Sequence, residues 1–90
     1  MKERITIIFE NEKIRIEAIE SFGAVSPEGF WYNSDVDEWV RVEKGSAILE
    51  TPEENILLKE GEQYYIKAHV KHRVAYTSDD CVWLCVYVKS

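Results

Sequence analysis

Short runs of alternating apolar and polar residues, separated by turn-forming residues, dominate the sequence. Alternation over about four to eight residues is typical of strands that bury one face. The runs predict strands over residues 4–9, 13–17, 38–43, 46–51, 56–58, 63–66, 72–77 and 82–88. Residues 16–20 also suit a short helical turn. No run is long enough to indicate a helix of more than two turns, so we predict an all-β sandwich or barrel.

Glycines and prolines mark the turns between these strands. We expect a hairpin about Lys44-Gly45, which would join the third and fourth predicted strands, and a further turn at 52–55. Residues 21–30 contain two of the four glycines and one of the two prolines. They predict a long loop, and long loops in compact domains are often functional.

Composition narrows the class of protein. The 90 residues are the length of one small domain, so we expect a single domain over 1–90. A net charge of −6 and scattered basic residues disfavour a nucleic-acid partner. No apolar run approaches the ~20 residues needed to cross a bilayer, and no signal-peptide pattern is present. We therefore expect a cytoplasmic protein.

The two cysteines favour a reducing compartment. Cys81 and Cys85 lie four residues apart on one predicted strand, which separates them by roughly 13 Å. A disulfide needs Cα atoms within about 7 Å, so the two cannot bridge each other. Without a CxxC spacing, we expect buried thiols that act as small apolar side chains.

Two ionisable side chains share a strand face with apolar residues. Glu38 has the same phase as Val40, and His72 has the same phase as Val74 and Tyr76. An acid and a histidine in these positions are candidates for the inside of a barrel. Burial of either group is unfavourable unless it is paired, hydrogen-bonded or bound to a metal. We therefore predict that Glu38 and His72 approach each other.

The sequence from about 29 to 88 resembles the cupins, a family of small barrels. The first cupin motif ends in a glutamate followed after six residues by a glycine, which Glu38 and Gly45 match. In the second motif a turn glycine precedes a histidine, and Gly61 and His72 have that separation. The resemblance implies a double-stranded β-helix, or jelly-roll, cupin barrel.

The chain departs from the cupin pattern where the family places its paired histidines. Those positions fall on Tyr32 and Ser34, or on Trp31 and Asn33 if the spacer is one residue longer. The resemblance implies a metal centre of three histidines and one carboxylate. Only one of those histidines and the carboxylate are retained, so the metal motif is degenerate.

Three roles remain open for Glu38 and His72. By the resemblance they are candidate ligands for Zn²⁺, Mn²⁺, Ni²⁺ or Fe²⁺, since imidazole and carboxylate suit such ions. Alternatively they hydrogen-bond each other or a buried water, or act as a general acid–base pair. A third metal ligand would have to come from His69, Asn33, Tyr32, Asp35 or Asp37.

Aromatic residues are numerous for a chain of this length. Rings at a barrel mouth, with a few polar groups, form typical small-molecule sites. We expect a small-molecule-binding cupin with an incomplete metal site; the alternatives are a metal-dependent isomerase, epimerase or dioxygenase, and a structural dimerisation module. The candidate pocket residues are Trp31, Tyr32, Tyr64, Tyr76 and Trp83.

One tryptophan has the opposite phase to the candidate site. Trp39 follows Glu38 directly, so it faces outward if Glu38 faces inward. Large outward aromatics are enriched at interfaces, and the isoleucine-rich strand 4–9 is a candidate to add to a partner's sheet. We expect a homodimer; the alternative is a monomer in which 4–9 covers its own barrel.

Overall fold

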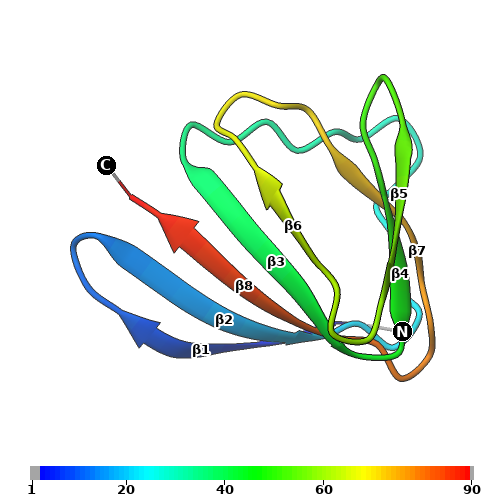
Figure 1. The fold of residues 1–90 in the computed structure, drawn as a ribbon, viewed down its shortest axis with the longest axis horizontal. Coiled ribbons are helices and arrows are strands. Elements are labelled where there is room, and N and C mark those ends of the chain that lie inside the picture. The colour runs from blue at the N-terminus through cyan, green and yellow to red at the C-terminus, as the bar shows by residue number, and fades with distance from the viewer. Residues whose placement is uncertain (1–2, 90) are drawn as a thin grey trace.

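The computed structural model describes residues 3–89, and each regular element in that range is a β-strand. Two antiparallel sheets form, with strand orders β1-β2-β8-β3-β6 and β5-β4-β7. Figure 1 shows the larger sheet on the left and the smaller on the right, converging toward the bottom of the view. The strands are β1 (Arg4–Glu10), β2 (Ile14–Glu20), β3 (Asp37–Lys44), β4 (Ser46–Glu50), β5 (Asn55–Lys59), β6 (Gln63–Ile66), β7 (Arg73–Thr77) and β8 (Val82–Val88).

This arrangement confirms the all-β jelly-roll prediction. The strand boundaries agree with the alternation in the sequence, and residues 16–20 belong to β2 rather than to a helical turn. The sheets are built mainly from pairings between strands far apart in the chain, such as β2 with β8 and β4 with β7.

The predicted hairpin about Gly45 is wrong. β3 pairs with β6 and β8, whereas β4 pairs with β5 and β7. Gly45 is instead the corner at which the chain passes from the larger sheet to the smaller one. Its φ is 78°, and a Cβ there would lie 2.2 Å from Ser78 Oγ and 3.1 Å from Cys81 Cα. Alternation identifies both strands but does not reveal which sheet each one joins.

The core lies between the two sheets. Trp83 anchors it from β8, and its indole nitrogen donates a hydrogen bond to Ser21 Oγ at 2.8 Å. This bond satisfies the polar end of a buried ring. The buried apolar residues are Val40, Val42, Ala47, Leu49, Leu58, Ile66, Cys81, Trp83 and Cys85.

Both cysteines are free and buried. Burial, assisted by Asp80, raises the pKa of Cys81 to about 11. Burial also raises the pKa of Cys85. The two thiols therefore stay protonated near neutral pH and pack as small apolar groups, as expected from the sequence.

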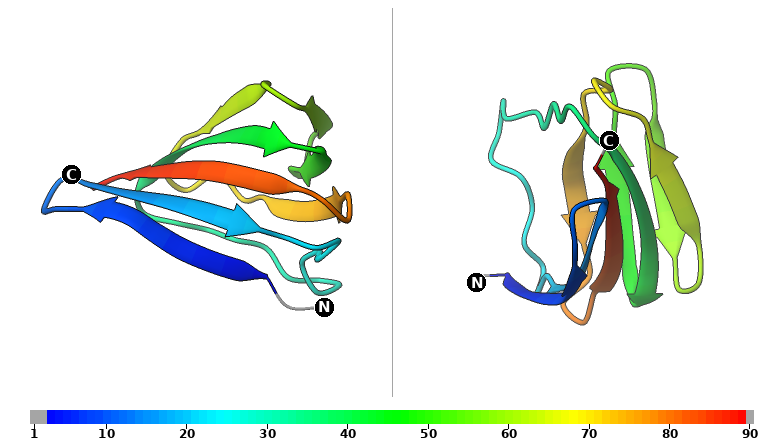
Figure 2. Two further views of the ribbon diagram at one scale, coloured as in Figure 1. Left: turned by 90° about the horizontal axis from the view of Figure 1, so that it is seen from below. Right: turned by 90° about the vertical axis from the view of Figure 1, so that its left-hand side faces the viewer.

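The long loop between β2 and β3 is tied to β7. Tyr32 and His72 exchange two backbone hydrogen bonds, of 2.7 and 3.1 Å. The Arg73 guanidinium donates to the carbonyls of Ser26 and Pro27, and Figure 2 (right) shows the loop in cyan running along one side of the barrel. These contacts bring the loop against one end of the space between the sheets.

Candidate functional site

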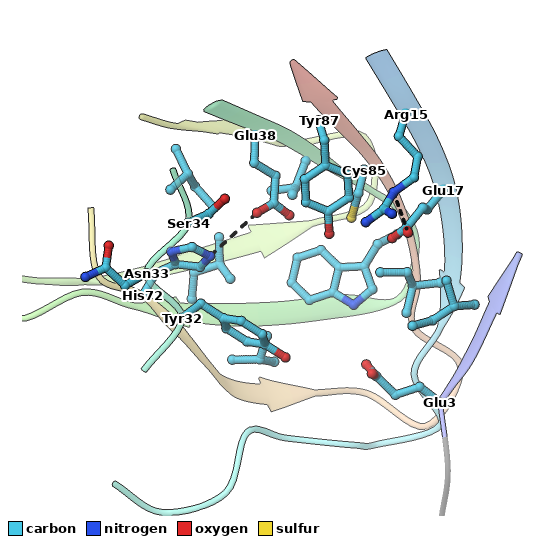
Figure 3. Close-up of a pocket in the computed structure, with 17 residues that line it drawn as sticks. Glu3, Arg15, Glu17, Tyr32, Asn33, Ser34, Glu38, His72, Cys85 and Tyr87 are labelled. Carbon is cyan, nitrogen blue, oxygen red and sulfur yellow. Dashed lines mark ion pairs between the residues drawn. The ribbon is translucent and has the colours of Figure 1, made fainter. Parts of the chain in front are cut away.

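A cavity of about 390 Å³ lies between the two sheets. Its walls come mainly from the inner faces of β2, β3, β7 and β8 and from the loop before β3, with single residues from β1, β4 and β6 (Figure 3). Apolar side chains form much of the lining, including Ile19, Val40, Leu49 and Val74. Polar groups gather at two places, one around His72 and one around Arg15 (Figure 3).

Glu38 and His72 approach each other in this cavity, as their shared inward phase predicts. Glu38 Oε1 lies 3.6 Å from His72 Nε2, and the two side chains are 13% and 7% exposed. The other imidazole nitrogen, Nδ1, is 2.9 Å from the carbonyl oxygen of Val70. That contact fixes the ring so that Nε2 points toward the carboxylate.

The surroundings of His72 favour its protonated form. Burial lowers the pKa of this imidazole, but the nearby Glu38 carboxylate and the contact with the Val70 carbonyl outweigh burial and raise the pKa above its ordinary value. The Glu38 carboxylate is therefore a hydrogen-bond acceptor, and the neighbouring His72 imidazole is a donor that is readily protonated. Such a pair can bind a hydroxyl or carbonyl group, or move a proton.

Two of the aromatic residues predicted for the pocket line it. Tyr32 stacks on His72 with ring centres 5.4 Å apart and an interplanar angle of 24°. Trp83 lines the deeper wall. Burial raises the pKa of Tyr32, with smaller contributions from Glu3 and Glu38. Its hydroxyl therefore stays protonated and can donate a hydrogen bond.

The other three predicted aromatics lie away from the cavity. Trp31 is half-buried in the loop, and Tyr64 packs from β6 against the core. Tyr76 is 45% exposed on the outer side of β7. A register shift between Ile48 and Leu49 explains this orientation, because it breaks the alternation on β7 and reverses the face of Tyr76 relative to Val74.

Of the other candidate metal ligands, Tyr32 lies against the Glu38–His72 pair with its ring stacked on the imidazole, and the rest do not reach the pair. His69 is exposed in the turn before β7 and has a φ of 69°. Asn33 lines the cavity, but Figure 3 shows its amide on the far side of His72 from Glu38. Asp37 hydrogen-bonds the Tyr65 hydroxyl and the Ala68 amide instead.

The residues present do not fit a resident transition-metal centre. Asp35 is exposed and lies outside the cavity lining. Within residues 3–89 no group of three or more His, Cys, Asp and Glu side chains could hold a metal ion. Tight sites of this kind supply three or four protein ligands, and Glu38 with His72 supplies two.

A second charged pair in the cavity was not anticipated from the sequence. Arg15 and Glu17 face inward from β2, with Arg15 Nε 3.1 Å from Glu17 Oε2. The sequence of β2 did not indicate that they face inward, because its isoleucines at 14 and 16 have the phase usually given to the buried face. Ile19 could have indicated it, since it shares the phase of both charged residues and also lines the cavity.

Comparison with known proteins agrees with this geometry. A model of the cupin domain matches residues 23–87. A protein of Ralstonia eutropha JMP134 with the provisional name mannose-6-phosphate isomerase is 38% identical, and the match covers 98% of this chain and 85% of that one with a TM-score of 0.93. The chain belongs to the cupin family.

More distant structures share the fold alone. KdgF from Halomonas sp. is 16% identical, with a TM-score of 0.85 over 99% of this chain and 82% of that one. An RmlC-like cupin from Shewanella frigidimarina NCIMB 400 is 13% identical, with a TM-score of 0.84 over 99% and 78%. A comparison with curated proteins gives no match. Among the described residues no helix is long and apolar enough to cross a membrane.

Proposed function

We propose that the protein binds a small polar organic molecule in the cavity between its sheets. One observation carries the proposal: an open cavity of about 390 Å³ places a buried carboxylate and histidine against aromatic walls. Small-molecule sites are concave and largely apolar, with a few well-placed polar groups. The family is consistent with this role and leaves the ligand open.

Each group has a definite part in binding. Glu38 accepts a hydrogen bond from a ligand hydroxyl, and His72 donates one to a ligand oxygen when Nε2 carries a proton. Tyr32 and Trp83 cover apolar faces of the ligand. The contact of His72 Nδ1 with Val70 keeps the imidazole in the orientation that this requires.

The proposal is tested by screening a library of uncharged fragments against the full chain, with binding detected by ligand-observed NMR. Glu38→Gln and His72→Asn should each weaken the best fragments by about tenfold, since hydrogen bonds to charged groups are worth about 1.5–3 kcal/mol. Glu60→Gln and His69→Asn are matched controls, because both residues are exposed and outside the cavity. Binding that is equal in all four variants would contradict the proposal.

A second candidate is a metal-dependent isomerase. The name of the R. eutropha relative favours it, whereas the two-ligand set opposes it. Because only two protein ligands would coordinate a bound ion and water would fill its other positions, we expect any transition metal to be lost on dialysis. Elemental analysis of protein purified without an affinity tag, before and after chelator treatment, checks this. Near-stoichiometric metal after chelation would favour the enzyme over the binding protein.

A third candidate, a structural module without a ligand, is less well supported. Buried ionic pairs stabilise a fold weakly, because the loss of hydration offsets their attraction. Glu38 with His72 is such a pair, and the same cavity holds a second pair in which the buried Glu17 carboxylate meets the partly exposed Arg15. Ligand binding explains why the chain carries them, whereas a purely structural role does not.

A further inference from the structure

The Arg15 end of the cavity forms a second polar site, made by Arg15, Glu17 and Tyr87. The guanidinium carbon of Arg15 lies 4.9 Å from the centre of the Tyr87 ring. The Glu17 side chain is only 8% exposed, so its carboxylate is largely removed from bulk water. Figure 3 shows the Tyr87 ring between Arg15 and Glu38. Stacking and pairing together hold the guanidinium in place.

This guanidinium has donor capacity that the protein does not use. Arg15 Nε is buried and has no hydrogen-bond partner within residues 3–89. Glu17 Oε2 is 3.1 Å away, but the Nε–H does not point at it. Buried donors without partners are rare and unfavourable. A ligand oxygen seated against Arg15 would supply the missing acceptor after a small rotation of the guanidinium.

The charges lining the cavity disfavour an anionic ligand. Each polar site is a carboxylate beside a base, Glu17 with Arg15 and Glu38 with His72. Glu3 adds a third carboxylate to the lining. The three carboxylates outnumber the two bases, so no positive charge is left unbalanced for a phosphate or carboxylate. A hydroxyl suits both sites, because it donates to a carboxylate and accepts from a base.

The spacing of the two sites sets the size of the ligand. Arg15 pairs with Tyr87, and Tyr87 pairs with Glu38, across β2, β8 and β3. Neighbouring strands are about 4.8 Å apart, so the backbones of Arg15 and Glu38 are roughly 10 Å apart. Their side chains reach inward from either side of the Tyr87 ring. A ligand that contacts both sites must therefore lie across the Tyr87 ring, and the cavity of about 390 Å³ has room there for one six-membered ring with hydroxyls at both ends.

We infer that the cavity takes a polyhydroxylated molecule of monosaccharide size that carries no anionic group, held by Arg15 and Glu17 at one end and by Glu38 and His72 at the other. This inference rests on the proposed function and specifies its ligand class. It also differs from the sugar phosphate in the name of the R. eutropha relative.

Neutral and anionic sugars test the inference on the full chain. Aldohexoses are titrated beside their 6-phosphates, and binding is monitored by chemical shifts. We expect a neutral hexose to bind at least about tenfold more tightly than its 6-phosphate, because the phosphate meets an excess of carboxylates at short range. A 6-phosphate that binds equally well would overturn the inference. Failure of every neutral hexose would also overturn it, while fragment binding would still support the proposed function.

Paired variants test the contribution of the second site. Arg15→Gln combined with Glu17→Gln removes both charges and leaves no unpaired ion. The matched control is Arg4→Gln with Glu20→Gln, which removes an exposed pair of 2.8 Å between β1 and β2. Hexose affinity should fall about tenfold in the first variant and stay unchanged in the control.

A single substitution separates binding from a purely structural effect. Glu17→Gln alone leaves the Arg15 charge unbalanced, so it should shift the preference of the cavity toward the 6-phosphate. If this preference does not move and the double variant binds hexose normally, the second site has no role in ligand selection and the inference fails.

Discussion

The protonation of His72 depends on its immediate neighbours. Its side chain is 7% exposed, and burial on its own lowers the pKa of an imidazole. Contact with Glu38 and with the Val70 carbonyl reverses that effect. A group whose pKa depends on one neighbouring carboxylate can be tested by changing that carboxylate alone.

We predict that Glu38→Gln lowers the pKa of His72. The substitution keeps the shape of the side chain and removes the charge that favours imidazolium. NMR titration of the His72 ring protons measures the pKa directly. His69 is the internal control, because it is exposed and outside the cavity. An unchanged His72 titration would show that the Val70 contact alone maintains the raised pKa.

The same shift predicts how stability depends on pH. The folded-state pKa of His72 is raised, so its stabilising contribution is complete below the unfolded value of about 6.5 and is lost as the pH rises through the folded value. The stability difference between wild type and Glu38→Gln should therefore be larger below about pH 6.5 than in alkaline solution. Urea denaturation at several pH values checks the sign, and a difference that grows with pH would contradict it.

Sequence reasoning at the residue scale found one of the two polar sites. Glu38 and His72 stand out because an acid or histidine shares a strand face with valines. Arg15 and Glu17 share their face with Ile19, while Ile14 and Ile16 have the opposite phase. On a strand with isoleucines on both faces, periodicity cannot decide which face is buried. The pairing of β2 with β1 and β8 decides it, and pairing partners are not visible in one strand's sequence.

At the scale of elements, Gly45 determines how β3 connects to β4. We predict that Gly45→Ala destabilises the protein by about 2 kcal/mol or more, because a positive φ alone costs an L-residue roughly 1–2 kcal/mol. The added Cβ would also lie 2.2 Å from Ser78 Oγ. That hydroxyl accepts a hydrogen bond from the Ser46 amide and donates one to Asp80, so it cannot move freely. Chemical denaturation measures the difference.

Gly61→Ala is the matched control for this corner. Gly61 has a φ of 84°, but a Cβ there meets nothing within 4 Å. Gly61→Ala should therefore lower the free energy of unfolding only by the roughly 1–2 kcal/mol that a positive φ costs an L-residue. Equal losses at the two glycines would mean that crowding at the corner has no energetic consequence.

The errors in predicting the elements have physical causes. Local alternation finds strands, since it reflects a half-buried surface. Whether a turn glycine closes a hairpin or a corner between sheets depends on partners that lie far along the chain, such as β6 and β8 for β3. The orientation of Tyr76 depends on a bulge against β4, which the sequence of β7 alone does not indicate.

At the scale of the whole molecule, the outer face of the larger sheet carries a continuous apolar row. The row crosses all five strands in register, from an exposed ring on the edge strand β1 to an exposed ring on β6. Its members are Phe9, Ile16, Val86, Trp39 and Tyr65. Exposed apolar patches of this kind commonly mark interaction sites.

The edge strand β1 has exposed apolar residues on both of its faces. Ile5 and Ile7, each more than half exposed, pair with Ile19 and Glu17 on the cavity face, whereas Phe9, 49% exposed, belongs to the outer row. Within the described residues β1 pairs with β2 alone, so its other edge is open to pairing. A two-fold axis would place the outer face of the larger sheet against the same face of a second copy. An apolar row needs no opposite charge on its partner, so it is complementary to itself.

We predict a homodimer formed through this outer face. Sedimentation at micromolar concentration should give about twice the chain mass of 10.5 kDa. Ile16→Lys puts a charge within the row, between Phe9 and Val86, and should dissociate the dimer. Trp39→Ala should weaken the dimer by removing a large buried contact. Leu57→Lys is the control, because Leu57 is 52% exposed on β5 of the smaller sheet. A mass of 10.5 kDa that does not change on dilution would exclude the dimer, whereas a dimer unaffected by Ile16→Lys would show that the open edge of β1, rather than the sheet face, makes the contact.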